Sequence, residues 1–386
     1  MMKKLFACIL IIFLFGIFTP NVFCQSTEPI KIGALLPITG PFAMWGKTFK
    51  NNLEFALSEY GNKVAGRPVE LIIEDEGGQD VTMALSKAKK LVESDKVGVI
   101  MGPFYTGSCL AVFPYTAKRP IVALKYASAA ENEVDFNYVF SSGVRYNDST
   151  YYLGQYAYDV MNVRSVTAIG SDFAAGHDFM QGFIDGFSGR GGKVVQKQWA
   201  PLTETDYSPY LSSLKMADAL VSSCLGPQAK IVLFKQYQEL GLFKKMPIIL
   251  AEAGPIPLPV LQQMGDEIIG TVGPNLYLPS LDNEANKKFY PAYMEKFHQI
   301  PDNMATTAYA AMIAVLTALD DTKGNTNAEV LAKALSKLEL NLPQGPFSFN
   351  DKRTAAQNLY ISKIEKTNGK LYWAIAKTYP KIKPYN

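Results

Sequence analysis

The feature that most constrains the fold is the regular alternation of short apolar segments with longer amphipathic ones. Short apolar runs bounded by turn residues predict buried strands, and apolar residues three or four apart predict helices. The first set of predicted strands lies at 30–36, 69–74, 97–101, 121–124 and 138–142, and helices follow at 81–93 and 110–117. This alternation is typical of βαβ units, so we expect a mostly parallel sheet.

A second α/β set follows Arg145. Its predicted helices lie at 149–161, 177–189, 207–216 and 228–240, and its strands at 165–170, 193–199, 219–223 and 248–250. The last part departs from this order, with helices at 283–298 and 306–321 and alternating segments at 359–365 and 370–378 around Asn368-Gly369, a strong hairpin signal. Two consecutive α/β sets predict two lobes, and the chain is long enough for both.

The segment from Ile30 to Glu59 combines a strand, a loop and a helix. The strand ends at Pro37, and the loop presents Thr39, Gly40, Ala43, Met44 and Trp45. Open α/β sheets bind their ligands at the carboxyl ends of their strands. We therefore expect this loop to border a binding site. Trp45 is either an aromatic wall of that site or a core residue.

The stretch GALLPITGPFAMWG resembles the first motif of the branched-chain amino-acid-binding family, the type I periplasmic solute-binding proteins of ABC importers. The resemblance implies an α/β fold of two lobes, each a mostly parallel sheet flanked by helices, with a terminal antiparallel hairpin. It also implies three crossings between the lobes, expected near Arg145, Tyr277 and Phe347. We accordingly expect lobe 1 at 28–145 and 278–347, and lobe 2 at 146–277 and 348–386.

Residues 1–24 have the layout of a secretory signal peptide. Lys3 and Lys4 precede an apolar run of about 14 residues, which is shorter than the ~20 residues of a membrane-spanning helix. We expect cleavage after Cys24 and a soluble periplasmic protein. A lipid anchor on Cys24 is the alternative, although no small residue directly precedes this cysteine.

Charge and cysteine content exclude several classes. The formal net charge is +3 without a basic block, which argues against a nucleic-acid partner. After processing only Cys109 and Cys224 remain, too few for a disulfide scaffold. We expect two buried apolar residues, with one bridge between them as the alternative.

Catalytic motifs are missing from the sequence. His177 and His298 are its only histidines, and neither has a metal-binding spacing. The sequence has no GxSxG elbow, P-loop or GxGxxG. The acidic run Glu74-Asp75-Glu76 is interpreted as a partly solvated strand end. We therefore expect no enzyme, no cofactor and no metal site.

Three further segments resemble the ligand-binding segments of the family. In VGVIMGPFYTGSCLAV, Tyr105, Thr106 and Gly107 lie at a helix start, where hydroxyl and N–H groups suit a carboxylate. In IVALKYASAAENE, the family supplies backbone groups and a hydroxyl to the same carboxylate, and the matching residues are Ala127 and Ser128, with Tyr126 beside them. Lys125 departs from the family pattern and is either an additional cation or a surface lysine.

Across the cleft, TAIGSDFAAGHDF carries Ala175 where the family often has an aromatic residue, with Phe173 two residues earlier. Glu252 follows the strand at 248–250, where amino-acid-binding members offer a carboxylate to the ligand ammonium. A buried ammonium needs such a partner. If Glu252 points outward instead, an aromatic or aliphatic acid becomes the more attractive ligand.

The resulting hypothesis is the substrate-binding component of an ABC importer, a monomer that binds an apolar, branched-chain or similar amino acid, closes by hinge motion and serves a membrane permease. A receptor for an aromatic or other organic carboxylate is the alternative within the same fold. A ligand-sensing module is the alternative from another class.

The carboxylate site yields a first prediction. Ser128→Ala should weaken ligand binding by about 1 to 2 kcal/mol, because it removes a hydrogen bond to a charged group. Isothermal titration calorimetry with the ligand measures this loss. An unchanged affinity would remove Ser128 from the site.

Overall fold

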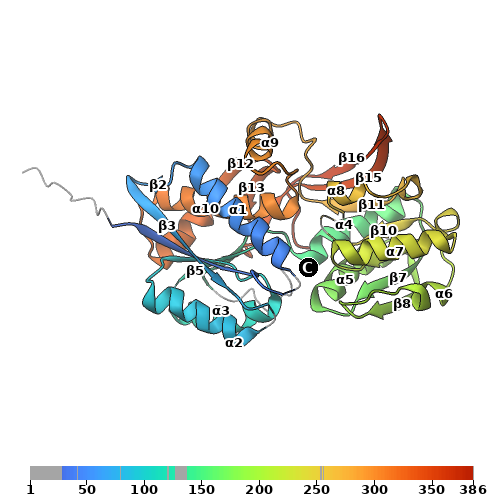
Figure 1. The fold of residues 1–386 in the computed structure, drawn as a ribbon, viewed down its shortest axis with the longest axis horizontal. Helices are drawn as coiled ribbons and strands as arrows, with labels where there is room; N and C mark the ends of the chain where they lie inside the picture. The colour runs from blue at the N-terminus through green and yellow to red at the C-terminus, as the bar shows by residue number, and fades with distance from the viewer. Residues whose placement is uncertain are drawn as a thin grey trace, which may run out of the picture.

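The computed structural model describes residues 28–40, 42–78, 80–119, 121–126, 137–252, 254 and 256–385. The predicted signal peptide therefore lies outside the described residues. Within the described part, no helix is long and apolar enough to cross a membrane. In the described residues two large sheets lie side by side, each with its own helices, and a small three-stranded sheet accompanies them (Figure 1).

The first sheet has the strand order β2-β3-β1-β4-β5-β6. Its strands are β1 (Ile30–Leu36), β2 (Lys63–Val64), β3 (Arg67–Asp75), β4 (Val99–Met101), β5 (Val122–Lys125) and β6 (Val139–Ser141), parallel except for the β2–β3 pair. Alternate residues of β1 point to opposite faces: Leu36 packs in the core with α1 (Ala43–Glu59), and Leu35 packs in the core with α2 (Val81–Lys89) and α3 (Thr106–Lys118). Burial on both faces explains the continuous apolar runs.

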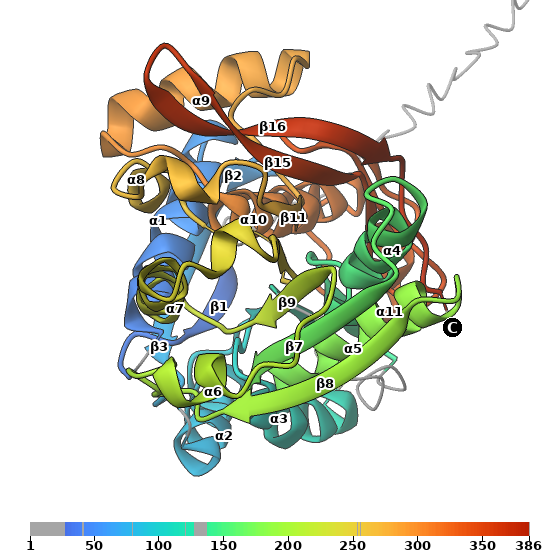
Figure 2. The ribbon, with the colours of Figure 1, turned by 90° about the vertical axis from the view of Figure 1, so that its right-hand side faces the viewer.

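The second sheet has the order β16-β15-β11-β10-β9-β7-β8 (Figure 2). Its strands are β7 (Ser165–Ser171), β8 (Lys193–Ala200), β9 (Ala219–Ser223), β10 (Ile248–Leu250), β11 (Val272–Asn275), β15 (Leu359–Thr367) and β16 (Lys370–Tyr379). One face packs against α4 (Tyr146–Asp159) and α5 (Ala174–Ser188), and the other against α7 (Pro227–Glu239). The predicted terminal hairpin is formed by β15 and β16, and its strand β15 pairs antiparallel with β11.

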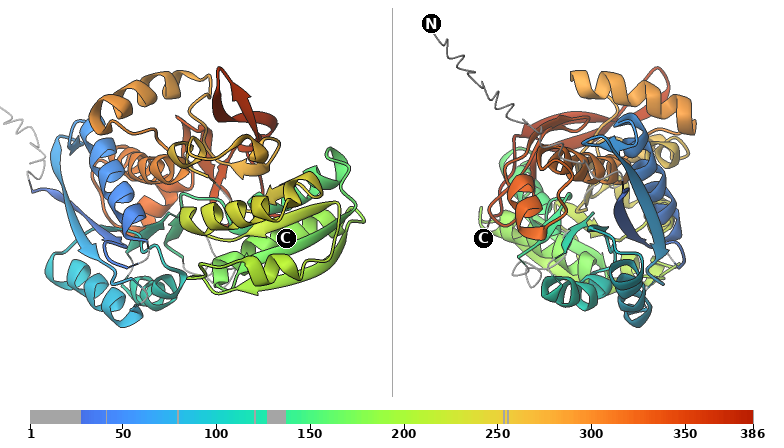
Figure 3. Two further views of the ribbon diagram at one scale, coloured as in Figure 1. Left: turned by 45° about the vertical axis from the view of Figure 1, so that its right-hand side comes forward. Right: turned by 90° about the vertical axis from the view of Figure 1, so that its left-hand side faces the viewer.

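Three short helices lie earlier in the chain: the π-helix η1 (Lys90–Ser94), α6 (Ser208–Ser212) and the 3-10 helix η3 (Leu242–Lys244). The other remaining elements lie between β10 and the hairpin. They are α8 (Leu258–Leu261), η4 (Asp266–Ile268), α9 (Glu284–Phe297), α10 (Asn303–Asp321), α11 (Ala328–Leu335) and a small antiparallel sheet of β12 (Glu339–Leu342), β13 (Gly345–Phe349) and β14 (Ala355–Gln357). Helices α10 and α11 pack in the core of the first sheet. The chain thus returns to the first sheet before it ends on the second (Figure 3). The predicted fold class is confirmed.

One predicted helix was wrong, and several elements, among them β11, α11 and the strands β12, β13 and β14, were not predicted. The helix predicted at 207–216 is only the short α6, because the Ser213 hydroxyl bonds to the carbonyls of Pro209 and Tyr210 and competes with the helix. Strand β11 was not predicted, since its Gly273 and Pro274 are disfavoured in strands.

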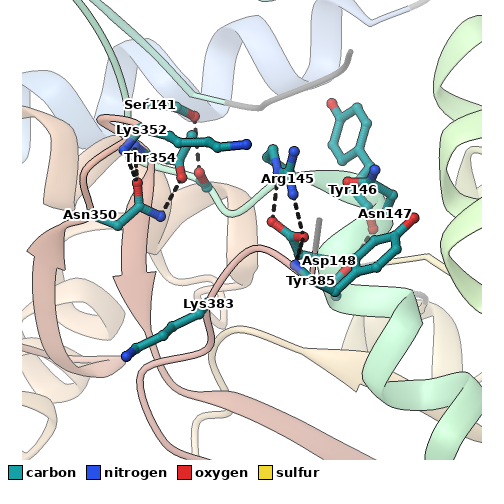
Figure 4. Close-up of polar contacts among 12 residues, drawn as sticks. Ser141, Arg145, Tyr146, Asn147, Asp148, Asn350, Lys352, Thr354, Lys383 and Tyr385 are labelled. Atoms are coloured by element: carbon teal, nitrogen blue, oxygen red, sulfur yellow. Dashed lines mark hydrogen bonds and ion pairs between the residues drawn. The ribbon is translucent and has the colours of Figure 1, made fainter. Parts of the chain in front are cut away.

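A buried polar cluster lies where the chain first passes from one sheet to the other (Figure 4). Arg145 donates two hydrogen bonds of 2.8 Å to the Asp148 carboxylate, and both side chains are buried. The Tyr385 N–H, near the end of the chain, also donates to Asp148 (3.2 Å). On the other side of this crossing, the Ser141 N–H donates to the Arg353 carbonyl at 2.9 Å. The cluster therefore joins three distant parts of the chain.

Arg145→Met should lower the free energy of unfolding by about 3 to 5 kcal/mol, because it leaves the Asp148 carboxylate buried without its cation. Urea unfolding measures this change. Arg190→Met is the matched control: it breaks an exposed pair with Asp159 (3.2 Å) and should cost at most about 1 kcal/mol. Equal, small losses in both variants would contradict the importance of the buried pair.

Candidate functional site

A cleft with a volume of about 840 Å³ opens between the two lobes. The first lobe contributes the start of α1, the loop from β4 to α3 and Tyr126. The second contributes the start of α5, the first turn of α7 and Glu252 after β10. Both sheets therefore present the carboxyl ends of their strands to the cleft, as open α/β sheets do.

An aromatic wall, formed by Phe42, Trp45, Phe104 and Tyr105, lines the side of the first lobe. The rings of Phe42 and Trp45 stack with centroids 4.6 Å apart, and Tyr105 stacks on Phe42 at 5.2 Å. Trp45 is half-buried and both borders the cleft and packs against the core of the first sheet. The two readings of Trp45 are thus compatible, and each ring is held in place by its neighbours.

Local contacts fix the loop that carries the wall. The Asp75 carboxylate at the end of β3 accepts the N–H groups of Ile38, Thr39 and Gly77 and the Thr39 hydroxyl. Burial raises the pKa of Asp75, but these hydrogen bonds outweigh burial and hold the pKa below its ordinary value. In the first turns of α1, a Cβ at Gly46 would collide with the Pro37 carbonyl, so glycine allows the helix to start close to the strand end.

Glu76 is fully buried next to the wall, so the prediction of a partly solvated acidic run is wrong for Glu76, whereas Glu74 and Asp75 are partly exposed as predicted. Its carboxylate accepts the N–H groups of Phe104 and Tyr105 at 3.2 Å. Burial raises the pKa of Glu76 to about 8, against the lowering effect of those hydrogen bonds. An internal carboxyl group thus occupies the Tyr105 N–H, one of the groups at this helix start that the sequence suggested for a ligand carboxylate.

The other predicted residues of the first lobe differ in position. Thr106 and Tyr126 line the cleft. Among the described residues, Gly107 and Lys125 are not part of the cleft lining. Gly107 faces α2, because a Cβ there would lie 3.2 Å from Val81. Ala127 and Ser128 lie outside the described residues.

The interpretation of Lys125 as a surface lysine is wrong. Its side chain is buried, and its Nζ lies 5.7 Å from the centroid of the Phe113 ring. Burial lowers the pKa of Lys125 to about 8.

The second lobe presents an apolar patch and a pair of charges. Phe173 and Ala175, at the start of α5, line the cleft together with Phe179 and Leu225. The Glu252 carboxylate faces the cleft and lies 2.6 Å from the Lys230 ammonium. Burial raises the pKa of Glu252 to about 7, although Lys230 opposes this rise.

Lys230 and Phe42 are cleft residues that the sequence reasoning did not identify. Lys230 lies in the first turn of a predicted amphipathic helix, where a lysine is ordinarily a surface residue. Phe42 precedes the first turn of α1 and adjoins the loop residues that were identified. Its position next to that loop could have indicated Phe42 as a cleft residue. Nothing in the sequence indicated Lys230.

The burial and contacts of the described cysteines and histidines do not indicate a catalytic or metal site. Cys109 and Cys224 are buried free thiols, which confirms the favoured interpretation. His177 contacts Asp172 (2.8 Å) and stacks on Trp199, while His298 ends α9 at the border of the cleft. Among the described residues, no group of three or more His, Cys, Asp or Glu side chains could hold a metal ion.

Two α/β lobes around an aromatic and apolar cleft define a two-lobed small-molecule receptor. The family model described as periplasmic binding protein matches residues 29–370, and the chain belongs to this family. It is 27% identical over 370 residues to Leu/Ile/Val-binding protein homolog 6 of Brucella melitensis, with 93% of each chain covered.

Solved structures of ABC-transporter solute-binding proteins resemble the whole chain. One from Rhodopseudomonas palustris BisB5, in complex with 3,4-dihydroxybenzoic acid, has 28% identity and a TM-score of 0.85, covering 93% of this chain and 99% of that chain. Another from R. palustris, in complex with 4-hydroxybenzoate, has 25% identity and a TM-score of 0.84, covering 92% and 98%.

These relatives confirm the predicted function class, the substrate-binding component of an ABC importer. Proteins of this class are substrate-binding proteins rather than enzymes, and they deliver small molecules to membrane permeases outside the cytoplasm.

The raised pKa of Glu76 gives a prediction for stability. Below about pH 4.5 the carboxyl is protonated in both states, and between pH 4.5 and about 8 only the unfolded chain releases the proton. Stability should therefore fall as the pH rises through this window. Glu76→Gln keeps an oxygen for the Phe104 and Tyr105 N–H groups and should flatten the fall in melting temperature between pH 5 and 8.

Glu252 contributes a fall of the same sign, so Glu76→Gln should reduce the slope without abolishing it. Glu239→Gln, an exposed change on α7, is the control and should keep the wild-type slope. Parallel curves for wild type and Glu76→Gln would contradict the role assigned to Glu76.

Proposed function

We propose that this chain captures a small carboxylate with an aromatic body in the cleft and presents it, after closure of the lobes, to a membrane permease. The observation that carries the proposal is the aromatic wall of one lobe facing a buried lysine of the other. Flat rings suit an aromatic body, and an ammonium has three N–H donors, so Lys230 can bind a ligand carboxylate while it keeps its contact with Glu252. The two relatives solved with hydroxybenzoates support this ligand class.

The Tyr126 hydroxyl supports a ligand with a polar group on the side of the first lobe. Tyr126 lines the cleft, stacks on Phe49 with centroids 4.4 Å apart and is 2% exposed. Its hydroxyl has no hydrogen-bond partner in the described part of the chain. Buried polar groups are rarely left unpaired, so a ligand hydroxyl or carboxylate is a suitable partner.

An apolar amino acid is the second candidate. Glu252 lies in the cleft, where a carboxylate could hold a ligand ammonium, and the curated relatives are named Leu/Ile/Val-binding protein homologs. The amine on the ligand is therefore the feature that separates the two candidates.

The proposal also covers the state of the protein: we propose a monomer in the periplasm, formed by removal of residues 1–24. Lipid anchoring at Cys24 is the alternative. We place lobe 1 at 28–145 and 278–347 and lobe 2 at 146–277 and 348–386, subject to one adjustment. Phe349 and Ala355 pack in the core of the first sheet, which favours a third crossing after Gln357 rather than near Phe347.

Removal of the Trp45 ring tests the function. Wild type should bind benzoate or 4-hydroxybenzoate in calorimetry, and Trp45→Ala should weaken this binding by about 1 to 2 kcal/mol, which is roughly 5- to 30-fold. The loss follows from the removal of one ring face from the wall.

Leu110→Ala, an exposed change on α3 outside the cleft, is the control and should bind as wild type does. If wild type binds none of a panel of aromatic acids, the proposed ligand class is wrong. If it binds them and Trp45→Ala does so equally well, the wall does not contact the ligand.

A further inference from the structure

Glu252 and Lys230 form a charged pair inside the cleft. The Lys230 Nζ lies 2.6 Å from a Glu252 carboxylate oxygen, and their side chains are 4% and 7% exposed. Cys224, a buried thiol of raised pKa, and through it Tyr207 are the other titratable groups beside the pair. Both side chains border the cleft, and each charge has the other as its partner.

The place of Lys230 on its helix is unfavourable in itself. Helix α7 begins at Pro227, after Gly226 with φ +89°, so Lys230 lies in its first turn. The amino end of a helix carries a partial positive charge and disfavours a cation. The ammonium is therefore held there by Glu252 rather than by the helix.

The cleft has no other carboxylate ready for a ligand ammonium. Within the described lining, Asp302 is the second acidic residue, and its side chain caps α10 by accepting the Ala305 N–H at 2.9 Å. A buried ammonium without a partner is costly. An α-amino acid in this cleft would have to compete with Lys230 for Glu252.

We propose that Lys230 is the specificity-determining residue of the cleft: its ammonium occupies the place at Glu252 that the amine of an amino acid would take. The cleft then accepts carboxylates without an α-amino group and discriminates against amino acids. The inference rests on the proposed function, because it assumes a carboxylate ligand.

Two ligands that differ only in the α-ammonium test this role. Phenylacetate and L-phenylglycine share the ring and the carboxylate. In calorimetry on the full chain, wild type should bind phenylacetate at least about tenfold more tightly than L-phenylglycine. Lys230→Gln frees the Glu252 carboxylate and should shift this ratio by at least about tenfold toward L-phenylglycine.

Two further variants test whether a changed ratio comes from the freed charge of Glu252 rather than from added space or from a loss of folding. Lys235→Gln, an exposed change on the same helix, should keep the wild-type ratio. The double variant Lys230→Gln/Glu252→Gln leaves no unpaired buried charge, so it should fold even where Lys230→Gln is unstable, and it should gain no affinity for L-phenylglycine.

The outcomes distinguish this inference from the proposed function. If wild type binds neither of these ligands nor any acid of the benzoate panel, both fail. If it binds benzoates but prefers L-phenylglycine to phenylacetate, only the role of Lys230 is overturned. If wild type binds phenylacetate but Lys230→Gln leaves the ratio unchanged, only the role of Lys230 is overturned. A gain of L-phenylglycine binding in the double variant equal to that in Lys230→Gln would also overturn it, because space rather than charge would then explain the gain.

Discussion

The site depends on the two-sided burial of the central parallel strands. Leu35 and Leu36 of β1 are both fully buried, in cores on opposite faces of the first sheet. Neither face of such a sheet is left to bind a ligand, and the carboxyl ends of its strands emerge together at one edge. The loops at this edge carry the aromatic wall, so the position of the cleft follows from the topology of the sheets.

Two carboxyl groups at the end of β3 hold the loops that border the cleft: the partly exposed Asp75 and the buried Glu76. Asp75 ties the loop before α1 to the end of β3, and Glu76 holds the loop before α3 through two backbone N–H groups. A buried carboxylate without such donors would be costly, whereas here it organises the backbone that carries Phe104 and Tyr105. These two residues of one strand end thus place the rings of the wall.

The sequence predicted the fold well where patterning was strong. The strands around Leu35 and Ile249 are short apolar runs, and the hairpin at Asn368-Gly369 has an explicit turn signal. Patterning failed where side chains compete with the backbone, as at Ser213, and where Gly and Pro occur in a strand, as in β11. At Ser213 the competition is local, within one helical turn, whereas β11 is fixed by its pairing with β10 and β15, and a single sequence does not contain that pairing.

For the cleft, the sequence indicated which residues line it but not which side chains pair with one another. Most of the predicted residues that the structure describes, among them Trp45 and Glu252, line the cleft, because strand ends can be located from apolar runs. The pairing of Glu252, after β10, with Lys230, in the first turn of α7, joins positions 22 residues apart, and neither spacing nor periodicity indicates it. Yet this pairing decides whether the carboxylate can receive an amine. The class of ligand therefore depends on a contact between two side chains, and similarity of the surrounding motif does not determine it.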